Sequence, residues 1–376
     1  MEASALTQVV KPLYSFLFPD HDANGPRLNN ESSEHGKCQD ISADKSITRY
    51  LLERSADFRE LTELRRKGWE NPEGDVYFRN QRRNADNCDD QTAQHFFRMM
   101  MKIGEEIHQS TNAFAIRSRE PRILDMCMAP GGFLATALKH NPGAKGLAFS
   151  LPPSSGGHRV LIQNSSAVEQ RFLDITMLAA DMGVEEIPKD HPDAGNFLSQ
   201  QLRPNQLFDL ALCDGQVLRT HERSEYREKR ESRRLTVVQL ALSLEYLRPG
   251  GAMVVLLHRL EAWDTADLLR AFCKFATVRT LKPTTSHTRR SSFYMVATRI
   301  QSRHPEAIRL VESWKNIWKI ATFGSDEDYQ RALRNDSSNA EKLLEEFGPR
   351  LERSGSRIWK VQSNALAKAP WCKDRK

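Results

Sequence analysis

The chain has 376 residues, 39% of them hydrophobic, which is enough to bury a sizeable core in one large domain with appended segments. No apolar run approaches the roughly 20 residues of a membrane-spanning helix. The first residues lack a basic segment followed by an apolar one, so we expect neither a membrane protein nor a secreted one. The formal net charge of +6 permits a polyanionic partner but does not require one.

Cysteine usage indicates a reducing compartment. The six cysteines are scattered, none forms a CxxC pair, and Cys127 and Cys213 fall in segments expected to be buried strands. This pattern suits reduced thiols in a cytoplasmic or nuclear protein and supplies no ligand set for structural zinc. We therefore expect no metal site.

The first 90 residues are interpreted as an N-terminal extension. Residues 1–20 are mildly apolar and are expected to pack on the core. Residues 20–45 carry turn-forming and polar residues that predict an exposed, flexible loop. Residues 46–72 look helical.

An alternating pattern of strands and helices occupies residues 91–302, beginning with an amphipathic helix over 91–109. Strands are predicted at 121–127, 145–150, 169–174, 207–213, 252–258, 276–281 and 292–299. Helices are predicted between them at 132–139, 223–247 and 262–274. Strands separated by helices indicate an α/β fold with a mostly parallel, doubly wound sheet. The last two strands are joined by a polar loop, which indicates a terminal antiparallel hairpin.

Residues 303–376 read as a helical C-terminal extension. Its helices are predicted at 304–321, 326–334, 338–352 and 356–367. Four tryptophans are spread through it, which fits an element that packs on the core or covers it better than a separate catalytic domain.

The most informative segment is Ile123-Leu-Asp-Met-Cys-Met-Ala-Pro-Gly-Gly-Phe133. It runs from an apolar strand through a Pro-Gly-Gly turn into a helical segment, a turn that brings backbone N–H groups and a helix N-terminus up to a ligand. The chain has neither GxxxxGK[ST] nor GxGxxG, so a P-loop and the usual dinucleotide fingerprint fit less well. The segment resembles the first motif of the FtsJ-like 2′-O-methyltransferases, which reads roughly Leu-Asp-Leu-x-Ala-Pro-Gly-Gly-Phe/Trp.

This resemblance implies a class I methyltransferase (Rossmann-like) fold over residues 91–302 with S-adenosylmethionine (AdoMet) as cofactor. The cofactor-binding residues that it implies in the turn are Asp125, Ala129, Pro130, Gly131, Gly132 and Phe133. Gly131 and Gly132 would lie where the methionine end of AdoMet crosses the turn. Ser150 ends the second strand where an acidic residue usually binds the ribose hydroxyls, and its hydroxyl can make one such bond. Asp174 would accept from the adenine amino group, and Asp214 would also border the cofactor.

The family's catalytic tetrad is Lys-Asp-Lys-Glu, and the resemblance carries over only part of it. Lys102, in Met-Met-Lys-Ile-Gly-Glu-Glu-Ile, takes the place of the first lysine, and Asp214 takes the place of the aspartate. Leu256 replaces the second lysine and Ser292 replaces the glutamate. His258 lies two residues beyond Leu256, on the same face of a strand. It is a candidate proton-transfer group near neutral pH.

Three functions are consistent with these features. The first is AdoMet-dependent methyl transfer to an oxygen, by resemblance the ribose 2′-OH of RNA, although no aromatic-rich RNA-binding module is visible. The second is a methyltransferase for a small molecule, with the loop at 20–45 and the C-terminal helices closing the pocket. The third is a catalytically degenerate, AdoMet-binding scaffold. Loss of the second lysine and the glutamate favours the scaffold, whereas retention of the first motif, Asp214 and Lys102 favours an enzyme.

Overall fold

A computed structural model describes residues 34–86, 89–163, 165–336 and 340–372. The predicted packing of residues 1–20 lies outside these residues, as does the first part of the loop predicted at 20–45. Among the helices of the described residues, none combines the length and the hydropathy that a membrane crossing requires.

A seven-stranded sheet forms the centre of the molecule, in the order β3-β2-β1-β4-β5-β7-β6. Its strands are β1 (Arg122–Asp125), β2 (Lys145–Ser150), β3 (Val168–Phe172), β4 (Phe208–Cys213), β5 (Leu247–His258), β6 (Thr277–Leu281) and β7 (Ser292–Ile300). The first five strands are parallel, and β7 pairs antiparallel with both β5 and β6. The predicted strands and the predicted terminal hairpin are therefore confirmed.

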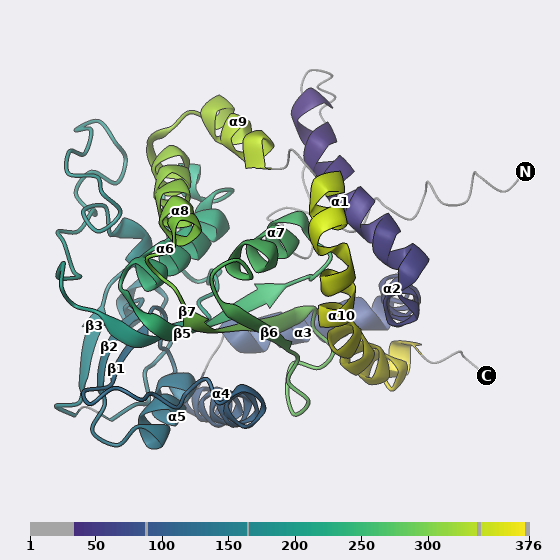
Figure 1. The fold of residues 1–376 in the computed structure, drawn as a ribbon, viewed down its shortest axis with the longest axis horizontal. Coiled ribbons are helices and arrows are strands. Elements are labelled where there is room, and N and C mark those ends of the chain that lie inside the picture. Colours follow the sequence, from purple (N-terminus) through teal and green to yellow (C-terminus); the bar gives the residue numbers. More distant parts are fainter. Residues whose placement is uncertain (1–33, 87–88, 164, 337–339, 373–376) are drawn as a thin grey trace, which may run out of the picture.

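Helices cover both faces of the sheet (Figure 1). One face carries α4 (Asp90–Thr111) and α5 (Gly132–His140), and the other carries α6 (Glu231–Glu245), α7 (Trp263–Phe272) and α8 (Pro305–Phe323). Each face has its own core cluster because the side chains of successive strand residues point to opposite faces. The helix predicted at 223–247 is shorter than expected, because residues 225–227 form a separate 3₁₀ turn before α6.

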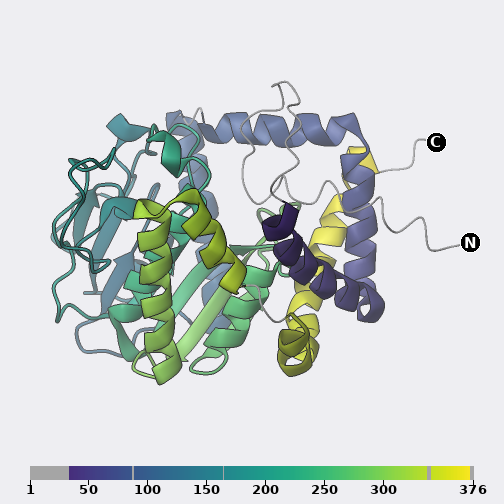
Figure 2. The same cartoon turned by 90° about the horizontal axis from the view of Figure 1, so that it is seen from above.

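The N-terminal and C-terminal segments pack against each other beyond β6 (Figure 1). They consist of α1 (Glu34–Arg54), α2 (Ala56–Trp69), α3 (Pro72–Asp86) and α10 (Ala340–Ala367), followed by the short turn η5 (Pro370–Cys372). The rings of Phe58 on α2 and Trp359 on α10 lie 4.9 Å apart. Figure 2 shows α3 running from the end of α2 toward the start of α4, so that it bridges this helical unit and the sheet.

Two predictions about these extensions are wrong. Residues 34–45 were predicted as loop but belong to α1, where Ala43, Ile47 and Leu51 recur at four-residue spacing and are buried. The two helices predicted at 338–352 and 356–367 form the single helix α10, which contains Pro349. The residues Leu351, Gly355 and Ile358, around the predicted break, are all buried. Their tertiary packing keeps the helix continuous where the local sequence predicted a break. Outside these helices, α9 (Asp326–Asp336) follows α8.

Gly132 sets the contact between α4 and α5. A Cβ atom at this position would lie 2.4 Å from the Phe97 carbonyl oxygen and 2.8 Å from the Met101 nitrogen, both backbone atoms of α4. The two helices can therefore approach this closely only because residue 132 has no side chain.

We expect Gly132→Ala to lower the free energy of unfolding by about 1–3 kcal/mol, because overpacking against backbone forces α4 to shift. Urea denaturation with an unchanged m-value is the appropriate measurement. Gly195→Ala is the matched control, since no heavy atom lies within 4 Å of its added Cβ, and it should stay within about 0.5 kcal/mol of the wild type. Equal stability of the two variants would contradict the α4–α5 contact.

Candidate functional site

The carboxyl ends of the parallel strands border a cavity of about 590 Å³. This is the edge at which open α/β sheets bind their ligands. Each parallel strand contributes to the lining, with Cys127 after β1, Ser150 on β2, Asp174 after β3, Asp214 after β4 and His258 on β5. The structure thus brings together four residues that the sequence predicted, namely Ser150, Asp174, Asp214 and His258.

The Pro-Gly-Gly turn presents only its first half to the cavity. Ala129 and Pro130 line it, whereas Gly131, Gly132 and Phe133 are not part of the lining. Phe133 packs edge-to-face on Tyr294, with ring centroids 5.5 Å apart. The absence of a side chain at Gly132 serves the contact with α4. The placement of Gly131 and Gly132 beside the methionine end of AdoMet stays a prediction.

Asp125 shapes the turn after β1 and does not line the cavity. Its side chain is buried, and Oδ1 accepts a hydrogen bond from the Cys127 nitrogen at 3.1 Å. Burial and the negative charge of Asp214 both raise the pKa of Asp125. We therefore assign Asp125 to holding the turn after β1.

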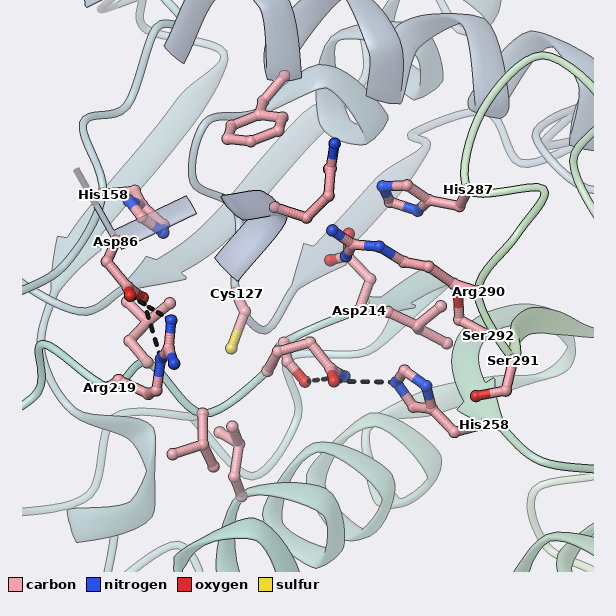
Figure 3. Close-up of a pocket in the computed structure, with 18 of the residues that line it drawn as sticks. Asp86, Cys127, His158, Asp214, Arg219, His258, His287, Arg290, Ser291 and Ser292 are labelled. Atoms are coloured by element: carbon pink, nitrogen blue, oxygen red, sulfur yellow. Dashed lines mark hydrogen bonds and ion pairs between the residues drawn. The ribbon is translucent and has the colours of Figure 1, made fainter. Parts of the chain in front are cut away.

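Asp214 lies at the carboxyl end of β4 and faces the cavity. Burial raises its pKa to about 7. The next residue, Gly215, keeps the turns after β1 and β4 close together, because a Cβ there would lie 2.3 Å from the Cys127 sulfur. A carboxyl group that titrates near neutral pH therefore stands at the centre of the site (Figure 3).

The region after β2 and β3 offers polar groups to the nucleoside end of AdoMet. Ser150 is buried and lines the cavity, and its hydroxyl makes only a long contact of 3.5 Å with the Leu151 carbonyl oxygen. Asp174 is already engaged. Its Oδ1 accepts from the Thr176 nitrogen at 2.9 Å, and its Oδ2 lies 2.6 Å from Arg227. These bonds leave the Asp174 carboxylate little capacity to accept a further hydrogen bond. The contact of Asp174 with adenine stays a prediction.

Arg227 organises a buried group of charges beside the cavity. Asp174, His221 and Glu231 offer ligand atoms within 4.8 Å of one another, an arrangement that by composition could hold a metal ion. The Arg227 guanidinium already supplies a positive charge there, with Nε 3.0 Å from Glu231. Burial alone would raise the pKa of Asp174, but Arg227 and the bonds from Thr176 offset it and lower that pKa.

The structure does not bring Lys102 into the site. The residues of α4 that line the cavity are Phe96, Met99 and Met100, and this stripe continues into the buried Ile103. Lys102 lies outside the stripe and its side chain is exposed. A catalytic role for Lys102 is therefore not supported by its position, because the part of α4 that faces the cavity is apolar.

Leu256 and Ser292, which the resemblance matches to the second lysine and the glutamate, both border the cavity. Leu256 lines the cavity and pairs with Tyr294 across β5 and β7, and Ser292 pairs with His258. Tyr294 also lines the cavity, and the sequence search missed it as a site residue although it stands in the same motif as Ser292. Positions 256 and 292 therefore contribute one apolar and one uncharged polar side chain to the cavity wall.

His258 is a neutral group in this site. Its Nε2 lies 3.0 Å from the Gln216 side-chain oxygen, so Nε2 carries the proton and Nδ1 is left as an acceptor (Figure 3). Burial, together with the positive charges of Lys282 and Arg290, lowers the pKa of His258 to about 4. The expectation that His258 would titrate near neutral pH is therefore wrong.

A buried lysine holds the loop between β6 and β7. The Lys282 side chain donates to the carbonyl oxygens of His287 at 2.8 Å, Ser292 at 2.6 Å and Arg290. An ammonium group has three donors, so these three acceptors satisfy it completely. The loop so held places His287, Arg290 and Ser291 on the cavity wall (Figure 3).

A second link closes the opposite side of the cavity. Arg219, in the loop after β4, forms an ion pair with Asp86 at the end of α3 (Figure 3). Both residues line the cavity, as does the neighbouring His158. Residues of α2, α3 and α10 also contribute to the lining, and sequence reasoning missed all of them because no local motif marks them.

We expect Lys282→Met to lower the free energy of unfolding by about 1–3 kcal/mol, because it leaves buried carbonyl oxygens without donors. Thermal denaturation measures this loss, and limited proteolysis should show faster cleavage within residues 283–291. Lys319→Met is the control, because Lys319 is exposed on α8 and should change neither reading. A Lys282→Met protein with wild-type stability and protection would refute the role of Lys282 in holding the loop.

The chain was compared with known proteins. No curated protein matches the chain in sequence. Solved structures of low similarity include a protein described as a ribosomal RNA methyltransferase from Plasmodium falciparum, with 14% identity, a TM-score of 0.34 and coverage of 53% of this chain and 97% of that one. They also include an O-methyltransferase family protein from Burkholderia thailandensis, with 13% identity, a TM-score of 0.33 and coverage of 64% and 72%. The model of the FtsJ-like methyltransferase family matches residues 101–300. The chain belongs to the FtsJ-like methyltransferase family, whose members use AdoMet.

Proposed function

We propose that this protein is an active methyltransferase that transfers the methyl group of AdoMet to a ribose 2′-OH of RNA. Membership of the family supports methyl transfer. The observation that carries the proposal of activity is Asp214, a carboxyl group with a pKa of about 7 that faces the cavity at the carboxyl end of β4.

The residues at the altered tetrad positions affect the pKa of Asp214. Two lysines beside an aspartate would favour its anionic form and lower its pKa. Here Leu256 and Ser292 add no charge and Lys102 lies outside the cavity, so burial dominates and raises the pKa of Asp214 to about 7. A base whose pKa lies near the working pH combines a useful ionised fraction with a strong pull on the proton.

The chemistry assigned to the chain is general base catalysis. AdoMet supplies an activated methyl group when it is bound. Asp214 would accept the proton of the attacking hydroxyl during methyl transfer and would be left protonated. Neutral His258 has Nδ1 free to accept a hydrogen bond from a neighbouring hydroxyl group. Cys127, Ala129 and Pro130 border the space in which the cofactor would lie.

The acceptor side of the cavity favours an anionic substrate. His287, Arg289 and Arg290 line it. Arg290 has no carboxylate within ion-pair distance among the described residues, and it is therefore available to a phosphate group. The net charge of +6 also favours the approach of an anionic substrate. Phosphate contacts by arginine position RNA without reading its sequence.

The test is the transfer of tritium from labelled AdoMet into total RNA, protein and small-molecule fractions. We expect label in RNA, recovered after nuclease digestion as 2′-O-methylnucleosides that resist alkaline cleavage. Label confined to small molecules would replace the proposal with a small-molecule methyltransferase. AdoMet binding with no label in any fraction would establish the scaffold.

We expect Asp214→Asn to lower kcat by ~10²-fold or more, because the base is lost. The wild-type rate should rise with pH through about 7, as Asp214 loses its proton, and this limb should disappear in the variant. S-adenosylhomocysteine binding, measured by calorimetry, is the control and should persist. Full activity of Asp214→Asn would exclude Asp214 as the base.

The same substitution has a predictable effect on stability. The folded pKa of Asp214 lies above its unfolded value of 3.8, so the folded state loses stability as pH rises from about 4 through about 7. Asp214→Asn should therefore gain stability over the wild type at pH 8 and lose that advantage at pH 4. Urea denaturation at the two pH values measures the difference, and a constant difference would contradict the raised pKa.

A further inference from the structure

The cavity extends beyond the sheet into the helical unit made by the two ends of the chain. Trp69 on α2, Phe78 on α3 and Trp371 on η5 line this part, together with Arg289 from the β6–β7 loop and Gln362 on α10. We call the space that these five residues line the acceptor chamber. Four of the five lie outside residues 101–300, the part of the chain that matches the family model.

The wall of the acceptor chamber is aromatic and well ordered by its own contacts. The rings of Tyr77 and Trp371 lie 4.5 Å apart, and those of Phe78 and Trp371 lie 6.2 Å apart. The Arg289 guanidinium packs over the Tyr77 and Trp371 rings at 5.3 and 5.5 Å. Gln362 donates to the Arg289 carbonyl oxygen at 3.1 Å, which fixes the β6–β7 loop to α10.

Trp371 carries an unused hydrogen-bond donor in this wall. The residue is 6% exposed, and its Nε1 has no hydrogen-bond partner among the described residues. Buried indole N–H groups usually find a partner, because an unpaired buried donor is costly. Gly68 on α2, which also lines the cavity, faces this edge of the indole, since a Cβ there would lie 3.6 Å from Nε1, at ordinary contact distance.

From this arrangement we propose that the acceptor chamber binds a single unstacked nucleobase of the substrate, an inference that rests on the proposed RNA function. A nucleobase offers a flat face to the aromatic wall and a ring nitrogen or carbonyl oxygen to Trp371 Nε1. Single-stranded RNA is recognised in this way, by stacking of splayed-out bases on aromatic and arginine side chains. Arg290, one residue from Arg289, then lies near the phosphate of the same nucleotide.

The test uses the full chain saturated with S-adenosylhomocysteine. Calorimetry compares the four ribonucleoside 5′-monophosphates with ribose 5-phosphate, which has the sugar and phosphate but no base. We expect the best-bound monophosphate to bind about 10-fold or more tightly than ribose 5-phosphate, because stacking is lost without the base. Equal binding of all five compounds would overturn the proposal.

The decisive variant is Trp371→Phe, which keeps the ring and removes the N–H group. It should weaken mononucleotide binding about 3- to 10-fold, the effect of one hydrogen bond, and leave ribose 5-phosphate binding unchanged. Trp359→Phe is the matched control, since Trp359 also has a buried, unpartnered Nε1 but does not line the cavity. Wild-type mononucleotide affinity in Trp371→Phe would overturn the proposal.

Methylation assays separate this inference from the proposed function. If RNA is methylated with the same KM by Trp371→Phe and the wild type, the nucleobase site is refuted and the function stands. If mononucleotide binding depends on Trp371 but no RNA is methylated, the nucleobase site stands and the function is refuted.

Discussion

The pairing of β7 between β5 and β6 is the constraint on which the site depends. Because β7 runs antiparallel to β5, its first residue, Ser292, meets the last residue of β5, His258. The β6–β7 loop therefore lies at the same edge of the sheet as the turns that follow the parallel strands. A slip of one residue in this register would turn the side chains of Ser292 and Tyr294 to the opposite face. Lys282 fixes the loop with a set of buried hydrogen bonds.

Asp214 is the carboxyl group at the centre of the site, and the nearby positions 256 and 292 hold the uncharged residues Leu and Ser. Leu256 contributes only apolar surface, and the positive charges of Lys282 and Arg290 act on His258 more than on Asp214. The result is a neutral imidazole beside a carboxyl group that titrates near pH 7. With Leu256 and Ser292 at these positions, burial governs the pKa of Asp214.

Sequence reasoning located the sheet and half of the site for clear physical reasons. The strands are marked by apolar runs and the first turn by its Pro-Gly-Gly, and both signals are local. Asp214 was found because it ends a buried strand. Lys102 was misplaced because a short motif does not fix which face of α4 meets the cavity. The acceptor chamber could not be found, since Trp69 and Trp371 are some 300 residues apart in the sequence and come to one cavity through the packing of α2 against α10 and η5.

This packing of the chain's two ends has a consequence for protein synthesis on the ribosome. The residues of β1 to β7 are complete when residue 300 has been made, and the strand-end residues that border the cavity all lie before it. The acceptor side requires Gln362 and Trp371, which are translated after every strand of the sheet. The sheet edge that borders the cavity is therefore translated before the C-terminal residues that enclose its far side. The helices α1 and α2 precede the sheet in the sequence, and they can pack against α10 only after all seven strands have been translated.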